Sequence, residues 1–485
     1  MSVPALRIRV LNEVPLRADG DYVLYWMTSA RRRAYNFGLQ RAVELAKAHR
    51  CGLVVFEPLR LGYEWASDRL HGFVLDGMVA NQRAFSDGPA LYYPYVEPQE
   101  GAGKGLLAAL AGRAVAVVTD YTPSFFLPRM LKAASKSIAA RMEVVDSNGL
   151  LPIAAAQSDF YSAYLFRRFL QKHLGPHLSE LPDEDPLAGV PLPAVSIAQV
   201  VARWPMASDA LLARDAHALA ALPIDHSVGV VRLRGGSEAA AGKLEDFLDD
   251  KLARYGEDRN QPDEDASSGF SPYLHFGHLS THHVFARLAA HEGWTADKLT
   301  RITSGKREGW WGMSPAAESF LDELVTWREL GYNHCARNPT TYDRYVSLPE
   351  WARATLEAHA SDPRPVVYSL EELATASTHD AVWNAAQREL VREGRMHNYL
   401  RMLWGKKILE WSPTPQVALE RLLQLNNRYA VDGRDPNSYS GIFWTLGRYD
   451  RPWAPQRAIF GQVRYMSSDN TLKKLHMKKY LARFA

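Results

Sequence analysis

Short apolar runs alternate with helical patterns through the first 150 residues, and this alternation is the strongest constraint on the fold. The apolar runs occupy 22–27, 53–56, 114–119 and 142–146, and each has the length of a β-strand. Residues 29–49 have the spacing of an amphipathic helix with Ser29 as its N-cap, and residues 128–141 form a second helical pattern. Strand–helix–strand alternation predicts a parallel, Rossmann-like α/β sheet. No glycine-rich nucleotide fingerprint follows these strands.

The rest of the chain has a different pattern. Residues 176–235 are rich in proline and irregular, which is typical of a connector. Helical patterns dominate from residue 236 onward, with loops expected at 256–271, 332–345 and 430–443. The 485 residues are enough for two or three domains. We therefore expect an α/β domain over 1–175, a linker over 176–235 and a larger all-helical domain over 236–485.

Composition narrows the range of functions. Hydrophobic residues make up 47% and charged residues 23%, as in ordinary globular proteins, and the net charge of +3 permits nucleic-acid binding without requiring it. Two cysteines, Cys51 and Cys335, are too few for an iron–sulfur cluster or a four-cysteine zinc site, so we expect no metal. There is no signal-peptide pattern and no long apolar run, so we expect a cytoplasmic protein without a membrane span.

A tryptophan-rich helical segment suggests redox chemistry. Met396, Leu400, Trp404, Ile408 and Trp411 recur at steps of three and four residues and would share one helical face that ends at Ser412-Pro413. Trp404 and Trp411 would then lie about 10 Å apart along the helix axis, a separation that suits electron hopping. Trp383 precedes them in a neighbouring helical pattern. A core helix that uses tryptophan only for packing is the alternative.

Two polar loops are candidates for ligand binding. Arg401 lies close to the apolar helix face and needs a carboxylate partner, for which Asp432 in the loop DGRDPN is a candidate. Residues 267–271 offer hydroxyl and backbone N–H groups ahead of a helix, an arrangement that can hold a pyrophosphate. A solvent turn and an ordinary capping loop are the respective alternatives.

Glu323 and Trp327 form a further candidate pair. At a separation of four residues on a helix they face the same way. A carboxyl group beside an indole suits a planar substrate, whose carbonyls would bond the acid while the ring stacks. An exposed, salt-bridged glutamate is the alternative.

Taken in order, these segments resemble the photolyase/cryptochrome flavoproteins. The phrases FSPYLHFGHLS, ESFLDELVTWREL, WNAAQ, MHNYLRM and DGRDPNSYSG carry the resemblance, and RMLWGKKILEW together with the early DYVLYWM is similar to the class II cyclobutane pyrimidine dimer (CPD) photolyases. The resemblance covers about 250 C-terminal residues well, and the N-terminal part mainly at 22–36 and around VDSNGLLP. It implies light-driven DNA repair, with an α/β domain followed by a helical domain that holds FAD.

The resemblance also implies roles for individual residues. Positions around the FAD phosphates are matched by Tyr255, Ser267, Ser268, Gly269, Phe270 and Ser271, and positions around the flavin by Arg328, Asn398, Arg401, Asn426, Asp432 and Asp435. The lesion pocket is matched by Glu323, Trp327, Met402 and Trp444, with Asn426 facing the flavin. Trp404, Trp383 and Trp411 match an electron-transfer chain that runs from the flavin outward to solvent.

Basic residues near the C-terminus are candidates for contacts with UV-damaged DNA, with a solvated face as the alternative: Arg451, Arg457, Arg464, Lys473, Lys474, Lys478 and Lys479. We expect a monomer. Family members carry a deazaflavin- or folate-type antenna chromophore or none, and the divergent stretch 85–135 leaves this open.

The chain departs from the class II pattern at one informative place. The loop from Trp444 to Asp450 is one residue shorter than usual and edges the expected lesion pocket, which bears on lesion preference. A cryptochrome-like photoreceptor without repair activity is the main alternative, although a receptor does not need the complete pocket. A (6-4) photolyase and a light-independent flavin oxidoreductase are weaker alternatives, since the paired histidines of the former and a nicotinamide fingerprint for the latter are not evident.

Overall fold

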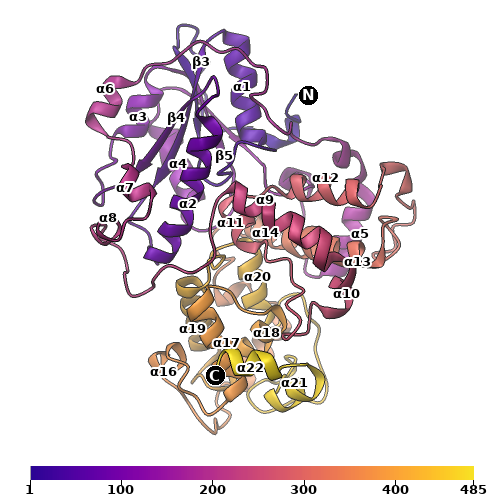
Figure 1. Ribbon diagram of the computed structural model, residues 1–485. Helices are drawn as coiled ribbons and strands as arrows, with labels where there is room; N and C mark the ends of the chain where they lie inside the picture. Colours follow the sequence, from indigo (N-terminus) through magenta and orange to yellow (C-terminus); the bar gives the residue numbers. More distant parts are fainter. Residues whose placement is uncertain (1) are drawn as a thin grey trace. The chain divides into compact units, whose positions relative to one another are not determined.

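The computed structural model describes residues 2–485, and by packing they form two compact units (Figure 1). The first unit comprises residues up to 156 together with 174–245 and 269–296. The second comprises 157–173, 246–268 and 297–485. The chain thus crosses between the units several times, whereas the sequence predicted consecutive domains joined by one linker.

The first unit is built on a six-stranded sheet of order β1-β6-β5-β2-β3-β4. All neighbouring strands are parallel except β1, which runs antiparallel to β6. The strands are β1 (Ile8–Val10), β2 (Tyr22–Trp26), β3 (Gly52–Leu59), β4 (Leu91–Val96), β5 (Ala114–Asp120) and β6 (Arg141–Val145). The α/β prediction is confirmed. The sequence did not predict the two edge strands, β1 and β4.

Four helices connect the strands: α1 (Phe37–His49), α2 (Asp68–Phe85), α3 (Leu106–Ala111) and α4 (Leu127–Ser137). The expectation that Ser29 caps the first helix is wrong, because α1 begins at Phe37 and the Asn36 side chain caps it by accepting the N–H of Leu39. Residues 28–30 instead form a loop whose three N–H groups donate to the carboxylate of Asp120, at 2.8 to 2.9 Å. Asp120, the last residue of β5, thereby joins the end of β5 to the loop that follows β2.

The proline-rich stretch 176–235 is not a simple connector. It contains α6 (Ala198–Arg203), α7 (Asp209–Leu212) and α8 (Ala216–Ala220). Ile197 and Trp204 pack into the core on one side of the sheet, and Leu187 packs into the other. This stretch, with α9 (Ser237–Asp246), α11 (Ser271–Phe276) and α12 (Thr281–His291), belongs mainly to the first unit.

The second unit is helical, as predicted. It contains α5 (Ala163–His173), α10 (Tyr255–Asp258), α13 (Pro315–Leu321), α14 (Arg328–Arg337), α15 (Glu350–Ala358), α16 (Leu370–Ala374), α17 (Ala381–Glu393), α18 (Asn398–Glu410), α19 (Pro415–Tyr429), α20 (Pro436–Trp444), α21 (Ser468–Lys474) and α22 (Lys478–Arg483). Its core is centred on α17 to α20, which Figure 1 draws together in orange and yellow. Two expected loops are partly helical, because α14 extends to Arg337 and α20 begins at Pro436.

One stretch of the second unit departs from regular helix. Asp322–Trp327, between α13 and α14, is π-helical. Such stretches are rare and occur often at functional sites. In residues 2–485, none of the helices combines the length and the apolar character that crossing a lipid bilayer requires.

Candidate active site

Three buried tryptophans form a continuous series of rings between α17 and α18. The rings of Trp404 and Trp383 are parallel, with centroids 6.4 Å apart, and those of Trp383 and Trp411 meet at 70° with centroids 5.5 Å apart. The indole N–H groups are fixed, since Trp404 donates to the Gln387 amide oxygen at 2.9 Å and Trp383 to the Trp404 carbonyl at 3.1 Å. The spacing argument for one continuous helical face holds only in part: Met396 precedes α18 and Trp411 follows its last residue.

The outer end of this series is covered. Trp411 is only 2% exposed, so the expectation of a series that runs outward to solvent fails at its third ring. The ring of Tyr368 lies edge-on against Trp411 at 5.3 Å, and the rings of His379 and Trp411 are 5.4 Å apart. The ammonium of Lys407 lies 5.5 Å from the Trp411 ring. These side chains exclude water from the indole.

A polar cluster lies one helical turn from Trp404. Arg401 on α18 donates to the side-chain oxygen of Asn426 at 2.8 Å and lies 3.7 Å from the Asp432 carboxylate. The Asn426 amide donates in turn to the Gly433 carbonyl and to the Ser438 hydroxyl, both at 3.0 Å. The pairing of Arg401 with Asp432 inferred from the sequence is therefore present, and Asn426 joins it.

A second polar chain links α14 to α20. Arg328 donates to the Tyr332 hydroxyl, and that hydroxyl donates to the Asp435 carboxylate, each at 3.0 Å. The other oxygen of Asp435 accepts the N–H of Asn437 and so caps α20. Tyr332 is fully buried, and burial raises its pKa well above the usual value, so the hydroxyl stays protonated as a donor. Sequence reasoning did not identify Tyr332. Asn398, the first residue of α18, is exposed.

The loop 267–271 crosses the boundary between the two units, with Ser267 and Ser268 in the second and Gly269, Phe270 and Ser271 in the first. Its role in binding a pyrophosphate stays a prediction. Gly269 has a φ of +69°, a left-handed conformation that favours glycine. A side chain there would meet the Lys243 side chain at 3.1 Å. Lys243 therefore places a cation beside this loop, which the sequence alone did not suggest.

Glu323 is held by an arginine that sequence reasoning missed. Its carboxylate lies 2.5 Å from Arg259, whose guanidinium also lies over the Tyr255 ring at 5.5 Å. The neighbouring Glu323 carboxylate raises the pKa of Arg259 against an opposing effect of burial, so the guanidinium stays charged. Arg259 thus connects Tyr255, expected near the FAD phosphates, with Glu323, expected in the lesion pocket.

The remaining residues of the expected lesion pocket are partly exposed. Trp327 ends the π-helical stretch, Met402 lies on α18 and Trp444 ends α20. Two cations flank the Trp444 ring: the ammonium of Lys406 and the guanidinium of Arg464, each 5.2 Å from its centroid. Whether Trp327 and Trp444 clamp a common substrate stays a prediction.

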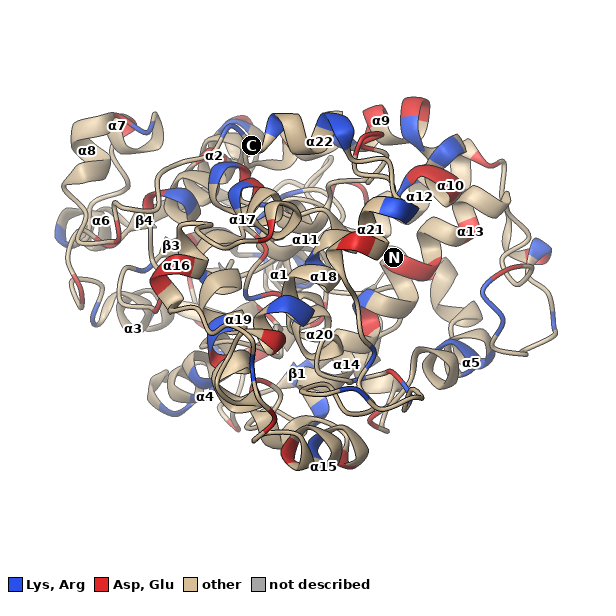
Figure 2. Cartoon of the chain, turned by 90° about the horizontal axis from the view of Figure 1, so that it is seen from below, with Lys and Arg blue, Asp and Glu red and all other residues tan. Residues whose placement is uncertain are grey.

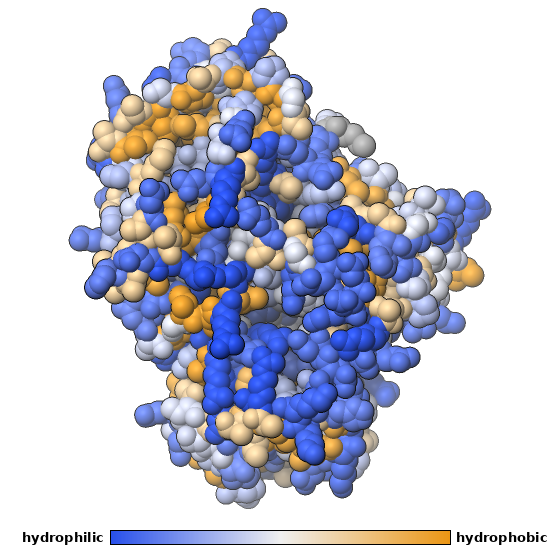
Figure 3. Space-filling view, viewed as in Figure 1, coloured by the Kyte–Doolittle hydropathy of each residue, from blue (hydrophilic) through white to orange (hydrophobic). Residues whose placement is uncertain are grey.

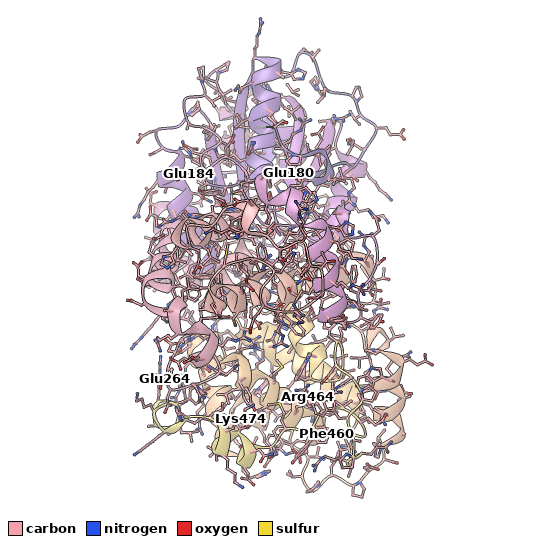
Figure 4. The ribbon with its side chains drawn as sticks, turned by 90° about the vertical axis from the view of Figure 1, so that its right-hand side faces the viewer. Glu180, Glu184, Glu264, Phe460, Arg464 and Lys474 are labelled. Atoms are coloured by element: carbon pink, nitrogen blue, oxygen red, sulfur yellow. The ribbon has the colours of Figure 1, made fainter. Side chains whose placement is uncertain are left out.

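The expected DNA contacts lie in the C-terminal part of the second unit. Arg451, Arg457, Lys473, Lys474, Lys478 and Lys479 are exposed, and Figure 2 shows basic segments on α21 and α22. Figure 3 shows a mostly hydrophilic surface where Figure 1 draws α17, α21 and α22. Arg464, which Figure 4 labels with Lys474, is different: it is half-buried and bonds the Asp450 carboxylate at 3.0 and 3.3 Å.

An open hollow adjoins these basic residues. It has a volume of about 360 Å³ and is lined by Tyr399, Tyr465, Met466, Ser467, Asn470, Thr471, Lys473 and Lys474. The ammonium of Lys474 lies 5.2 Å from the Tyr399 ring, and Arg457 lies 4.8 Å from the Tyr465 ring. Cations over aromatic faces, with hydroxyl groups nearby, are the groups that bind single-stranded nucleic acid.

Comparison with known proteins identifies the family. No family model matches the chain. A crystal structure of a bacterial class III photolyase from Agrobacterium tumefaciens has a similar fold, with a TM-score of 0.69 and 17% sequence identity over 96% of this chain and 86% of that one. The fold is therefore that of a photolyase.

Curated relatives are similar over nearly their whole length. The deoxyribodipyrimidine photo-lyase of Methanothermobacter thermautotrophicus is 35% identical over 99% of this chain and 98% of its own. Those of Oryza sativa and Arabidopsis thaliana are each 34% identical, over 98% and 99% of this chain and 90% and 93% of theirs. The chain belongs to the deoxyribodipyrimidine photo-lyase family of enzymes.

Proposed function

We propose that this enzyme repairs cyclobutane pyrimidine dimers in DNA by light-driven electron transfer from reduced FAD, as a class II photolyase. The single observation that carries the proposal is the buried series Trp404, Trp383 and Trp411, which begins one helical turn from the Arg401–Asn426–Asp432 cluster. A hydrolase needs no such series of rings. We further propose that the protein acts as a cytoplasmic monomer.

The polar cluster fits a flavin. The isoalloxazine ring presents alternating donors and acceptors along one edge, and Arg401, Asn426 and Asp432 supply a cation, an amide and a carboxylate together. The N–O distance of 3.7 Å between Arg401 and Asp432 leaves both groups with hydrogen-bonding capacity. The buried side-chain amide nitrogen of Asn427, next to Asn426, makes no hydrogen bond to the described residues. These groups, with Arg328, Asn398 and Asp435, would hold the cofactor.

The electron chemistry belongs to the cofactor. Reduced FAD, when bound, supplies the electron that opens a dimer after absorption of blue light. Trp404, Trp383 and Trp411 would supply electrons for reduction of the flavin, and their burial protects each ring from water. The proposed DNA contacts at Arg451, Arg457, Arg464, Lys473 and Lys474 would hold the phosphate backbone.

The lesion-side residues would position the flipped-out dimer. Extrusion is easiest for a damaged pair, and Trp327 and Trp444 offer aromatic faces for it. In this structure the Glu323 carboxylate accepts from Arg259. Donation from Glu323 to a dimer carbonyl therefore requires that the carboxyl group first take up a proton and leave Arg259. Arg259 itself is a charged donor at the same place and can bond a carbonyl directly.

The decisive experiment is repair in vitro. The purified, photoreduced protein is mixed with dimer-containing oligothymidine and illuminated with blue light, and the recovery of thymine absorbance is followed. We expect recovery that requires light. Photoreduction without recovery would contradict repair and would indicate a cryptochrome-like photoreceptor instead.

A further inference from the structure

Trp444 is held between two cations of different character. Arg464 reaches the ring from the chain segment that follows α20, and its charge is balanced by the Asp450 carboxylate at 3.0 Å. Lys406 reaches the same ring from α18 and has no carboxylate at salt-bridge distance among the described residues. The two contacts therefore differ in electrostatics although both distances are 5.2 Å.

Lys406 is an unusual lysine because its side chain is completely buried, with 0% exposure. Lysines are almost never fully buried unless they are paired. Its ammonium donates to the carbonyl of Thr445 at 2.6 Å. Thr445 follows Trp444 and begins the shortened loop that ends at Asp450. The side chain of Lys406 thus contacts both the indole and the first peptide of that loop.

The packing around this contact leaves little freedom. A Cβ added to Gly405 would lie 2.4 Å from the Thr445 side chain, so α18 touches this part of the loop directly. Asp450, at the other end of the loop, accepts from the Trp453 indole at 3.2 Å as well as from Arg464. The loop is therefore fixed by Lys406 at its start and by Arg464 at its end.

We propose that Lys406 is a positioning residue for lesion recognition. It holds Trp444 and the shortened Trp444–Asp450 loop in place, and its amine takes up a proton when DNA covers them. The proposal rests on the proposed function and adds a residue to it. Lys406 does not touch the substrate in this arrangement; it acts through the indole and the loop.

The charge of Lys406 makes this role dependent on pH. Burial lowers its pKa from the usual value to about 7; the nearby Asp450 opposes this effect and Arg464 adds to it. Phosphates that approach Trp444 favour the protonated amine, so DNA binding takes up a proton and the affinity falls as pH rises. If the pKa of Lys406 is one unit higher in the DNA complex than in the free protein, the affinity falls about tenfold as pH rises through both pKa values.

The test is dark binding of a fluorescent oligonucleotide with one dimer, from about pH 6 to about pH 8.5, a range that spans the titration. An undamaged oligonucleotide is measured in parallel, and each variant is checked by thermal unfolding. Lys406→Met removes the amine, whereas Lys406→Gln keeps a donor for Thr445 without a charge. Lys407→Met is the matched control, because Lys407 is the adjacent buried lysine of α18 but pairs with Glu410 at 2.9 Å.

We expect wild type and Lys407→Met to bind the dimer less tightly as pH rises. Lys406→Met should bind about tenfold more weakly at low pH and show a flat profile, and Lys406→Gln should recover part of the affinity while its profile stays flat. Unchanged affinity and an unchanged pH profile in both Lys406 variants overturn the proposal and leave repair standing. A wild type that does not prefer the dimer contradicts the proposed function as well.

Discussion

The buried ion pair between Arg167 and Asp322 holds the start of the helical stretch that carries two of the proposed lesion-side residues. Asp322 begins the π-helical stretch that carries Glu323 and Trp327. Its two carboxylate oxygens accept from the Arg167 guanidinium at 2.7 and 2.9 Å, and both side chains are buried. Arg167 also donates to the Gly305 carbonyl at 3.2 Å. The pair therefore connects α5 to the π-helical stretch within the second unit.

Replacing Asp322 with alanine leaves the buried Arg167 guanidinium without its carboxylate partner. Loss of one member of a buried pair typically lowers the free energy of unfolding by about 3–5 kcal/mol. For a unit of this size, each kcal/mol lowers Tm by about 2–4 °C, so we expect a fall of roughly 6–20 °C. Because the π-helical stretch loses its attachment, affinity for dimer-containing DNA should also fall.

A double replacement tests the electrostatic explanation. Arg167→Met combined with Asp322→Leu removes both charges, and we expect it to recover most of the stability, since apolar replacements of a buried pair are often neutral. Glu245→Ala is the control: it breaks the exposed pair with Arg287 and should change stability by less than about 1 kcal/mol. Calorimetry measures Tm for each variant. A single Asp322 variant as stable as the control, or a double variant no better than the single one, would refute the reasoning.

Three further predictions concern the tryptophan series, DNA binding and the pH dependence of stability. Trp383→Phe removes the middle ring, so flavin photoreduction should slow strongly, whereas Trp310→Phe, at a buried indole outside the series, should leave it unchanged; equal rates in both variants would mean that another route carries the electron. Replacing Lys473 and Lys474 with glutamine should lower the slope of log affinity against log salt by about 2, measured by titration at several salt concentrations, and an unchanged slope would exclude phosphate contacts there. Burial lowers the pKa of His278 to about 3, so the unfolded state binds a proton that the folded state does not below about pH 6.5; stability should fall as pH drops from there towards 3, and denaturant unfolding of His278→Gln should show a weaker fall.

Local patterns in the sequence were enough to predict the α/β sheet and the helical unit, and they singled out the segments of the candidate site. The edge strand β4 was missed because it contains Pro94 and three tyrosines and so lacks the apolar run expected of a strand. An edge position tolerates proline. Ser29 looked like a helix cap, but Asp120, some 90 residues away, binds the same N–H groups and keeps the segment in a loop. Both errors reflect tertiary contacts that a local pattern does not contain.

The charged residues of the site were the hardest to predict. Lys243 and Lys406 occur in helical patterns and Arg259 in an expected loop, and in both settings a solvated side chain is the ordinary expectation. The importance of Arg259 is visible only in the folded chain, where it pairs with Glu323. The same holds for Lys406, which folding brings to the Thr445 carbonyl. Spacing likewise related Trp404 to Trp411 but could not place Trp383 between them, since its position depends on how α17 packs against α18.

Helix α18 shows why periodicity could not assign its faces. Residues 403–409 are all buried, so the helix has no polar side to orient it. Arg401 and Trp404 are three residues apart and share one face of the helix. From this face Arg401 bonds Asn426 and Trp404 stacks on Trp383. Met402 and Lys406 are four residues apart and share another face, from which Lys406 contacts Trp444 and Thr445. Helix α18 thus carries both the proposed electron-transfer residue Trp404 and the proposed lesion-side residue Met402. A change at Lys406 should therefore alter lesion binding without disturbing the tryptophan series.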